Sequence, residues 1–182
     1  EHANLHLASS MSVRYANFIG LTSEKNGVRV FSNRGTSGID GATSTAVGHS
    51  LLSDQLNILI TGDIAFFYDR NAFWHTYPLP NLRVLLLNNH GGAIFKMIDG
   101  PASLPEADPY FVTEQNLTAR YLCQEFNFDH LLLDTNRKLK NLLIDFFTID
   151  GRTKVLEIES DATASQTIFD KYKRKIKQHY EP

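Results

Sequence analysis

Cysteine is almost absent from this sequence, since Cys123 is the single one in 182 residues. One cysteine cannot form an internal disulfide or a cysteine-based zinc cluster, and it favours a reducing, cytoplasmic location. Apolar runs are short, and none reaches the roughly 18 to 20 residues that a membrane-spanning helix needs. Neither sign of charge dominates, because 18 basic residues face 20 acidic ones. This balance argues against nucleic acid or an anionic membrane as a partner.

The composition that remains is that of an ordinary globular protein, with 42% hydrophobic and 21% charged residues. A chain of this length is expected to fold as one domain, residues 1–182, with a buried core. The first four residues, Glu-His-Ala-Asn, resemble neither a signal peptide nor a natural start, and we interpret them as a cut between domains. The polar, lysine-rich end is typical of a natural C-terminus.

Short apolar runs alternate with longer amphipathic stretches along the chain. Several apolar runs are nearly continuous in Val, Ile and Leu, which is typical of strands covered on both faces. The alternation predicts an α/β fold with three layers, α/β/α, around a six-stranded, mostly parallel sheet. Strands are expected at Leu5–Ala8, Val28–Phe31, Asn57–Thr61, Leu82–Leu87, His130–Leu133 and Lys154–Ile158, and helices near Ser10–Leu21, Gly41–Ser53, Phe66–Tyr77, Leu117–Asn127, Arg137–Thr148 and Ala164–Gln178.

The longest stretch without a clear pattern runs from about Asn88 to Asn116 and contains several glycines and prolines. It follows Leu82–Leu87, the most hydrophobic of the expected strands. A connection of this length in a compact domain is usually functional or disordered, so we expect one or the other here.

Polar residues follow two successive strands, at the edge where open α/β sheets bind ligands. Asp63 comes after one strand, and Asn89 comes after the next, 26 positions later. A carboxylate and an amide at adjacent strand ends, about 4.8 Å apart, can hold one Mg²⁺ ion, which completes its shell with phosphate oxygens and water. Taken alone, Asp63 could be a helix N-cap, and His90 beside Asn89 could be incidental.

A glycine-rich loop, Ser32–Gly41, follows another expected strand. Its glycines let the backbone approach a ligand closely, but their spacing is not that of a nicotinamide-dinucleotide fingerprint. A simple turn before a helix explains the glycines equally well. Arg34 suggests more, because an arginine at a strand end suits bidentate recognition of a carboxylate or phosphate.

The pair Gly62-Asp63, followed by Asn89 and Gly91, resembles the motif of thiamine-diphosphate enzymes. In those enzymes the aspartate, the asparagine and a backbone carbonyl two residues further on hold the divalent metal. The resemblance therefore implies that Asp63, Asn89 and the carbonyl of Gly91 bind Mg²⁺ or Mn²⁺, and that Gly62 and Ile64 contact thiamine diphosphate. The usual motif begins Gly-Asp-Gly, so Ile64 departs from it.

Four longer segments are similar to the 2-succinyl-5-enolpyruvyl-6-hydroxy-3-cyclohexene-1-carboxylate synthases, the MenD family of menaquinone biosynthesis. They are Ser10–Arg14, Ser32–Gly41, Phe67–Ala72 and Asn88–Phe95. The likeness spans the whole chain in order. It implies the thiamine-diphosphate-binding fold, in the form of the C-terminal, diphosphate-binding (PP-type) domain of a larger three-domain enzyme.

Members of this family decarboxylate 2-oxoglutarate on the cofactor and add the resulting succinyl unit to isochorismate. The resemblance implies that Ser10, Arg14 and Arg34 face substrate carboxylates, as expected for two polycarboxylate substrates. It also implies that Ile39 is the apolar wedge that holds the cofactor in its bent shape. A surface position on the first helix is the simpler explanation for Arg14.

The same resemblance implies that Ile94 and Phe95 line the substrate pocket, although plain core packing would also explain both. The family's cofactor-activating glutamate lies on a further domain, so no catalytic residue can be assigned within this chain. Active sites in the family form against the N-terminal pyrimidine-binding domain of a second subunit, in a homodimer or homotetramer. The chain alone is therefore expected to be inactive, with apolar surface exposed or covered by self-association.

Two other functions remain open at this point. An acetolactate-synthase-like enzyme would use the same cofactor on small 2-oxo acids, which need fewer arginines than Arg14 and Arg34 supply. A stand-alone binding module would keep the fold without catalysis, and Asp63→Ala would then leave its function intact. The length of the open reading frame separates the module from the larger enzyme.

Overall fold

The structure is a computed structural model, and it describes residues 2–20, 27–97, 100 and 104–180. The chain divides into two compact units. The first consists of Glu1–Asn88 and Thr118–Glu159, and the second of Asn89–Leu117 and Ser160–Pro182.

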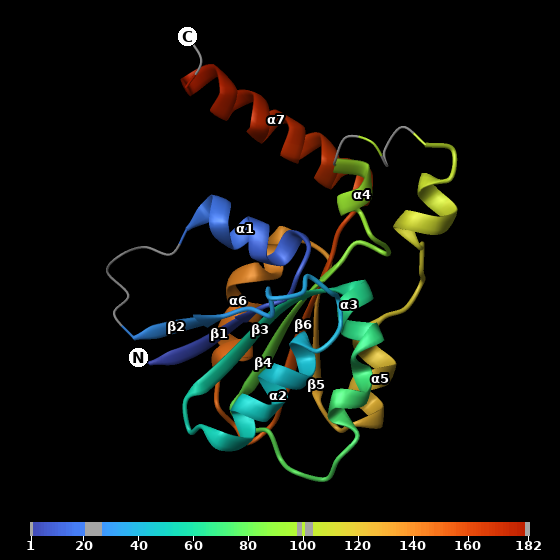
Figure 1. Ribbon diagram of the computed structural model, residues 1–182. Helices are drawn as coiled ribbons and strands as arrows, with labels where there is room; N and C mark the ends of the chain where they lie inside the picture. The colour runs from blue at the N-terminus through green and yellow to red at the C-terminus, as the bar shows by residue number, and fades with distance from the viewer. Residues whose placement is uncertain (1, 21–26, 98–99, 101–103, 181–182) are drawn as a thin grey trace. The chain divides into compact units, whose positions relative to one another are not determined.

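The first unit is built on a six-stranded sheet in which every neighbouring pair of strands is parallel (Figure 1). The order of the strands is β2-β1-β3-β4-β6-β5, so the most hydrophobic strands lie in the middle. The strands are β1 Ala3–Leu7, β2 Val28–Phe31, β3 Leu56–Gly62, β4 Leu82–Asn88, β5 Asp129–Leu133 and β6 Lys154–Glu159.

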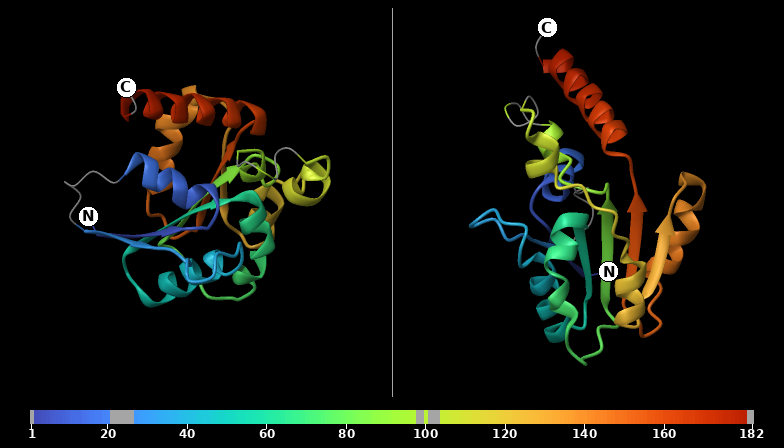
Figure 2. Two further views of the ribbon diagram at one scale, coloured as in Figure 1. Left: turned by 45° about the horizontal axis from the view of Figure 1, so that its top comes forward. Right: turned by 90° about the vertical axis from the view of Figure 1, so that its right-hand side faces the viewer.

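Helices cover both faces of this sheet and complete three layers. Helices α2, α3 and α5 lie on one face, and α6 lies on the other (Figures 1 and 2). This arrangement follows from right-handed crossovers between parallel strands. The helices of this unit are α1 Met11–Ile19, α2 Ala42–Leu52, α3 Asp63–Tyr68, α5 Ala119–Glu125 and α6 Leu139–Phe147, with short 3-10 helices η1 Arg70–Phe73 and η4 Asn136–Lys138.

Two apolar clusters hold the layers together. Leu82, Val84 and Leu86 alternate along β4 and are fully buried in the larger cluster, which includes residues of α2, α3 and α5. On the opposite face, Leu156 of β6 packs with Phe146 of α6. Apolar side chains on both faces of β4 and β6 explain why these strands read as nearly continuous hydrophobic runs.

The predicted fold is confirmed, with two differences in its elements. The sheet is parallel throughout rather than mostly parallel. The helix predicted at Phe66–Tyr77 is wrong in its bounds, because α3 begins directly after β3 at Asp63 and gives way to η1 after Tyr68. Asp69 interrupts the helix, and its carboxylate accepts hydrogen bonds from the backbone N–H and hydroxyl of Ser44, at 2.8 and 2.7 Å, in the first turn of α2.

The second unit contains α4 Ile94–Met97, the π-helix η3 Ala107–Val112 and α7 Ala162–Tyr180. The described part of the segment expected to be irregular thus contains two short helical elements. They pack against each other through Phe95 and Phe111, whose ring centroids lie 5.6 Å apart, and through a 2.9 Å ion pair between Lys96 and Asp108. Within the described ranges, no helix is both long and apolar enough to cross a membrane.

Arg83 is a buried arginine at the second position of β4. Its guanidinium donates to four backbone carbonyls, at distances between 2.7 and 3.1 Å. Two of these carbonyls, of Thr148 and Arg152, belong to the segment between α6 and β6. One side chain therefore satisfies the carbonyls that the start of β4 and this neighbouring segment leave without strand partners.

We expect Arg83→Met to lower the free energy of unfolding by about 2 to 4 kcal/mol, because it leaves buried carbonyls without donors. Urea unfolding of the purified protein measures the change. The matched control is Arg120→Met on the exposed face of α5, which should stay within about 0.5 kcal/mol of the parent. Equal losses in the two variants would contradict this account of Arg83.

Candidate functional site

The parallel ends of β3 and β4 place Asp63 and Asn88 at one edge of the sheet. The strands pair in parallel, with Gly62 opposite Leu87. The next residue after Gly62 is Asp63, which is 2% exposed, and the next after Leu87 is Asn88, which is fully buried. Gly62, rather than Asp63, occupies the N-cap position of α3, so capping does not explain the aspartate. Asn89, the predicted metal ligand, follows Asn88 directly in the chain.

Asn89 and Gly91 line one cavity of the second unit, with a volume of about 250 Å³. The side-chain oxygen of Asn89 is buried, and no described residue donates a hydrogen bond to it. A buried amide oxygen without a donor is unfavourable unless a ligand satisfies it. Oxygen atoms of this kind are ligands that Mg²⁺ accepts. The predicted position of Asn89 therefore fits a divalent cation.

Glycine allows a close backbone approach at two positions of the same turn. A Cβ atom at Gly91 would lie 3.0 Å from the carbonyl oxygen of Val112, and one at Gly92 would lie 3.1 Å from that of Phe111. A side chain at either position would crowd the end of η3. The carbonyl of Gly91 accepts the N–H of Ala93 at 3.0 Å within this turn.

The loop after β2 is closed by Asn33. Its side-chain amide donates to the carbonyl of Gly41 at 3.1 Å and to the hydroxyl of Thr45 at 2.9 Å, at the start of α2. Gly41 is the N-cap of α2 and has a φ of 77°, which explains its glycine. Ile39 is half-buried, and Arg34 is exposed, with no hydrogen bond or ion pair among the described residues.

Ser10 and Arg14 lie together after β1. Ser10 precedes α1 with a φ of 75°, an uncommon backbone conformation for serine, and its hydroxyl does not cap the helix. The guanidinium of Arg14 donates to the carbonyl of Ser10 at 2.9 Å. Strained residues of this kind tend to occur at functional sites.

Ile94 and Phe95 form the start of α4 in the second unit, and both are half-buried. Phe95 packs against Phe111, as the alternative explanation of these residues by core packing would require. His90, beside them in sequence, has a φ of 60°, and its carbonyl accepts the N–H of Gln115 at 3.1 Å.

Sequence reasoning missed a buried carboxylate in the first unit. Glu157 lies in the middle of β6 and is fully buried. It accepts hydrogen bonds from Asn88 at 2.8 Å, from the hydroxyl of Thr118 at 2.8 Å and from the N–H of Ala119 at 3.2 Å, and it pairs with His130 at 2.6 Å. The sequence signal that could have found this residue is a glutamate within an otherwise apolar run. A buried carboxylate is costly unless other groups donate hydrogen bonds to it.

These partners set the charge state of Glu157. Burial alone would raise its pKa, but hydrogen bonds from His130, Asn88, Thr118 and the backbone of Ala119 outweigh burial and hold the pKa below its ordinary value of 4.5. Burial and the nearby Glu157 carboxylate raise the pKa of the Cys123 thiol to about 12. The cysteine is therefore a packing residue rather than a nucleophile. No cluster of three His, Cys, Asp or Glu side chains suits a metal ion within the described part of the chain.

Curated relatives of this chain share one name. The chain is 54% identical to the 2-succinyl-5-enolpyruvyl-6-hydroxy-3-cyclohexene-1-carboxylate synthase of Cytophaga hutchinsonii over 178 residues, which are 98% of this chain and 32% of that protein. The synthase of Bacteroides thetaiotaomicron is 35% identical over 98% of this chain and 32% of its own length. The chain spans about one third of the length of these relatives. No protein-family model matches it.

A solved structure shares the fold at low sequence identity. Benzoylformate decarboxylase from Polynucleobacter necessarius superposes with a TM-score of 0.70 over 89% of this chain and 30% of that chain, at 15% identity. The similarity confirms the thiamine-diphosphate-binding fold expected from the sequence, and the relatives confirm the resemblance to the MenD family.

The lowered pKa of Glu157 predicts how stability changes in acid. Because the unfolded chain binds this proton more readily, the stabilisation is complete above about pH 4.5 and is lost as the pH falls through the lower folded pKa. Glu157→Gln should therefore be less stable than the parent at neutral pH and lose stability less steeply below pH 4.5. Urea unfolding from about pH 3 to pH 7 measures both slopes, and parallel curves would show that Glu157 does not control this dependence.

Proposed function

We propose that this chain, which belongs to the MenD family and spans about one third of the length of its relatives, is the domain that binds thiamine diphosphate and Mg²⁺ or Mn²⁺. The whole enzyme would decarboxylate 2-oxoglutarate and add the succinyl unit to isochorismate. The observation that carries the proposal is the buried side-chain oxygen of Asn89, to which no described residue donates a hydrogen bond. Asn89 directly follows β4, the strand that pairs with β3 just before Asp63.

In this proposal Asp63, Asn89 and the carbonyl of Gly91 hold the metal ion. Few protein ligands suit Mg²⁺, which keeps oxygens of phosphate and water in its shell. The ion neutralises the diphosphate and anchors the cofactor, and we assign it no role toward the substrate. Gly62 and Ile64 flank Asp63 and would contact the diphosphate as well.

The bound cofactor supplies an electron sink for decarboxylation, and the residues of this chain supply orientation and electrostatics. Ile39 would support the bent cofactor from the loop before α2. Ser10, Arg14 and Arg34 would bind substrate carboxylates, and Ile94 and Phe95 would line the apolar wall. Guanidinium groups suit this task because they bind carboxylates in bidentate geometry.

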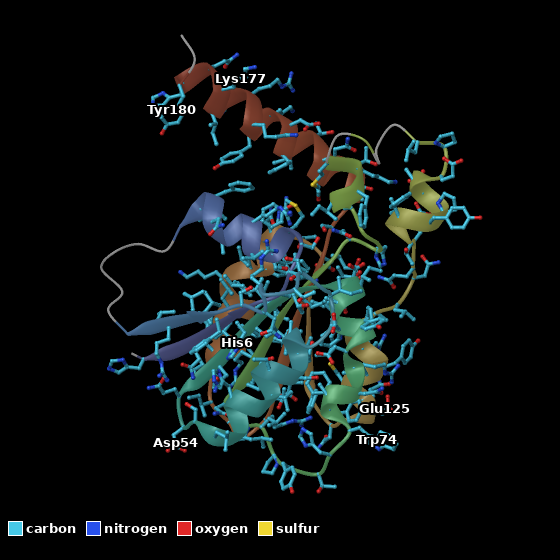
Figure 3. All side chains as sticks on the ribbon, viewed as in Figure 1. His6, Asp54, Trp74, Glu125, Lys177 and Tyr180 are labelled. Atoms are coloured by element: carbon cyan, nitrogen blue, oxygen red, sulfur yellow. The ribbon has the colours of Figure 1, made fainter. Side chains whose placement is uncertain are left out.

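The remaining parts of the active site would come from outside this chain. We assign the cofactor-activating glutamate to the pyrimidine-binding domain of a second subunit, in a homo-oligomer. Exposed aromatic side chains support such contacts, since Trp74 is 82% and Tyr121 71% exposed. Trp74 and Glu125 lie at one edge of the first unit (Figure 3), where an ion pair between Arg70 and Glu125 joins η1 to α5. The chain alone would then bind cofactor weakly and show no turnover.

The metal site is tested by Asp63→Asn in the full-length protein. We expect the half-saturating concentration of Mg²⁺ for thiamine diphosphate binding to rise roughly 100-fold or more, because the charged ligand is lost. Titration calorimetry measures binding without turnover. The control is Asp54→Asn, an exposed aspartate in the turn that precedes β3 (Figure 3), which should match the parent within about twofold. Unchanged binding in Asp63→Asn would refute the metal site.

The substrate assignment is tested by Arg34→Ala. Arg34 makes no ion pair within the described structure, so we expect normal stability and normal cofactor binding. Loss of a charge-assisted contact should raise the KM for one of the two substrates roughly tenfold to 100-fold. Steady-state assays with 2-oxoglutarate and isochorismate measure this change. Faster decarboxylation of pyruvate than of 2-oxoglutarate by the parent would instead favour an acetolactate-synthase-like enzyme.

A further inference from the structure

The chain passes between its two units at three places, and Glu157 is close to all of them in the first unit. The first unit ends at Asn88, resumes at Thr118 and ends again at Glu159, two residues after Glu157. The segment Asn89–Leu117 therefore leaves from Asn88 and returns to Thr118. It carries Asn89 and Gly91, two of the proposed metal ligands.

One carboxylate holds both ends of this segment. Oε1 of Glu157 accepts the side-chain amide of Asn88 at 2.8 Å, and Oε2 accepts the hydroxyl of Thr118 at 2.8 Å. Both oxygens also lie 3.2 Å from the N–H of Ala119, the first residue of α5. His130 of β5 closes the set at 2.6 Å from Oε2. Asn88 and Thr118, the two anchors of this segment, are thus both hydrogen-bonded to β6 through the same carboxylate.

Stability alone is a weak reason to keep a carboxylate here. Transfer of an ionised group into a fully buried position costs several kcal/mol, and apolar residues of similar size often replace buried ion pairs without loss. Fully satisfied buried polar networks instead restrict the chain to one arrangement. The arrangement restricted in this case is the spacing and direction of the two ends of the segment.

We propose that Glu157 is a positioning residue for the metal-binding turn, acting through Asn88 and Thr118. This proposal rests on the function proposed above, because the turn matters only if Asn89 and Gly91 hold the ion. A segment with fixed ends loses less conformational freedom when it binds a ligand than one with free ends. Asn88 provides the more direct link between Glu157 and the turn. Its side chain is hydrogen-bonded to Glu157, and Asn89 is the next residue in the chain.

The test uses the full-length protein and compares Glu157→Ala with Glu157→Gln. Alanine removes the acceptor for both anchors, whereas glutamine keeps an oxygen for Asn88 and can donate its NH₂ group toward Thr118 and His130. We expect Glu157→Ala to raise the half-saturating Mg²⁺ concentration for thiamine diphosphate binding roughly tenfold to 100-fold, the range seen when outer-shell partners of metal ligands are removed. Glutamine should restore it to within about threefold of the parent.

A second readout needs neither metal nor cofactor. Hydrogen exchange of peptides covering Asn89–Met97 should accelerate at least fivefold in Glu157→Ala and less than twofold in Glu157→Gln. The matched control is Thr153→Val, which removes a buried hydrogen bond of 2.8 Å to the carbonyl of Leu79 just before β6. It lowers global stability but should leave both the exchange of these peptides and the Mg²⁺ requirement unchanged.

The outcomes separate this proposal from the proposed function. If Asp63→Asn abolishes cofactor binding while Glu157→Ala changes neither readout, the positioning role is wrong and the metal site stands. If Glu157→Ala and Thr153→Val change both readouts equally, the effect is loss of stability and the positioning role is also wrong. If the parent shows no Mg²⁺-dependent cofactor binding, both proposals fail, whatever the exchange rates are.

Discussion

The parallel pairing of β3 with β4 is the constraint on which the candidate site depends. Its register places Gly62 opposite Leu87, so Asp63, which follows β3, and Asn88, the last residue of β4, lie at the same edge of the sheet. Parallel strands need a helical crossover between them, and here the crossover must fit between Asp63 and the start of β4. A shift of one residue would exchange the two faces of β4 and place Leu82, Val84 and Leu86 away from their core. The apolar core therefore fixes the positions of polar residues that contribute nothing to it.

A buried charged side chain satisfies hydrogen-bonding groups at each of two opposite edges of the sheet, and the two charges have opposite signs. Arg83 lies where β4 begins, and its guanidinium donates to carbonyls that the backbone leaves unpaired. Glu157 lies near the other end and accepts from the donors of Asn88, Thr118 and Ala119. Helices of a parallel α/β fold end near the edge where the strands begin and start near the edge where the strands end. Unpaired helix carbonyls therefore suit a buried cation at the first edge, and unpaired helix N–H groups suit a buried anion at the second. Only the second edge adjoins the segment that carries Asn89, which gives the anion a role beyond stability.

Hydrophobic pattern was enough to predict the strands, because their apolar character is local and each lies within two residues of its predicted place. The sequence also paired Asp63 with Asn89, since one helix-and-strand unit fits the spacing. It could not predict that Glu157 binds Asn88 and Thr118, which lie far apart in sequence and meet only through the sheet order. The end of α3 at Asp69 escaped for a similar reason, because Ser44 of α2 provides the partner for Asp69. Contacts of this kind depend on tertiary packing rather than on periodicity.

The residues that form the fold and the residues proposed to bind the substrate lie in different parts of this molecule. The chain superposes on benzoylformate decarboxylase with a TM-score of 0.70 although only 15% of residues are identical, so very different sequences form this fold. Arg34 lies outside that core, in an exposed loop that packing does not constrain. Under the proposed function, a change there would alter which anion binds without any effect on how the sheet forms. The fold therefore says little about the substrate, and the proposed substrate assignment depends instead on the residues of the loops that follow β1, β2 and β4.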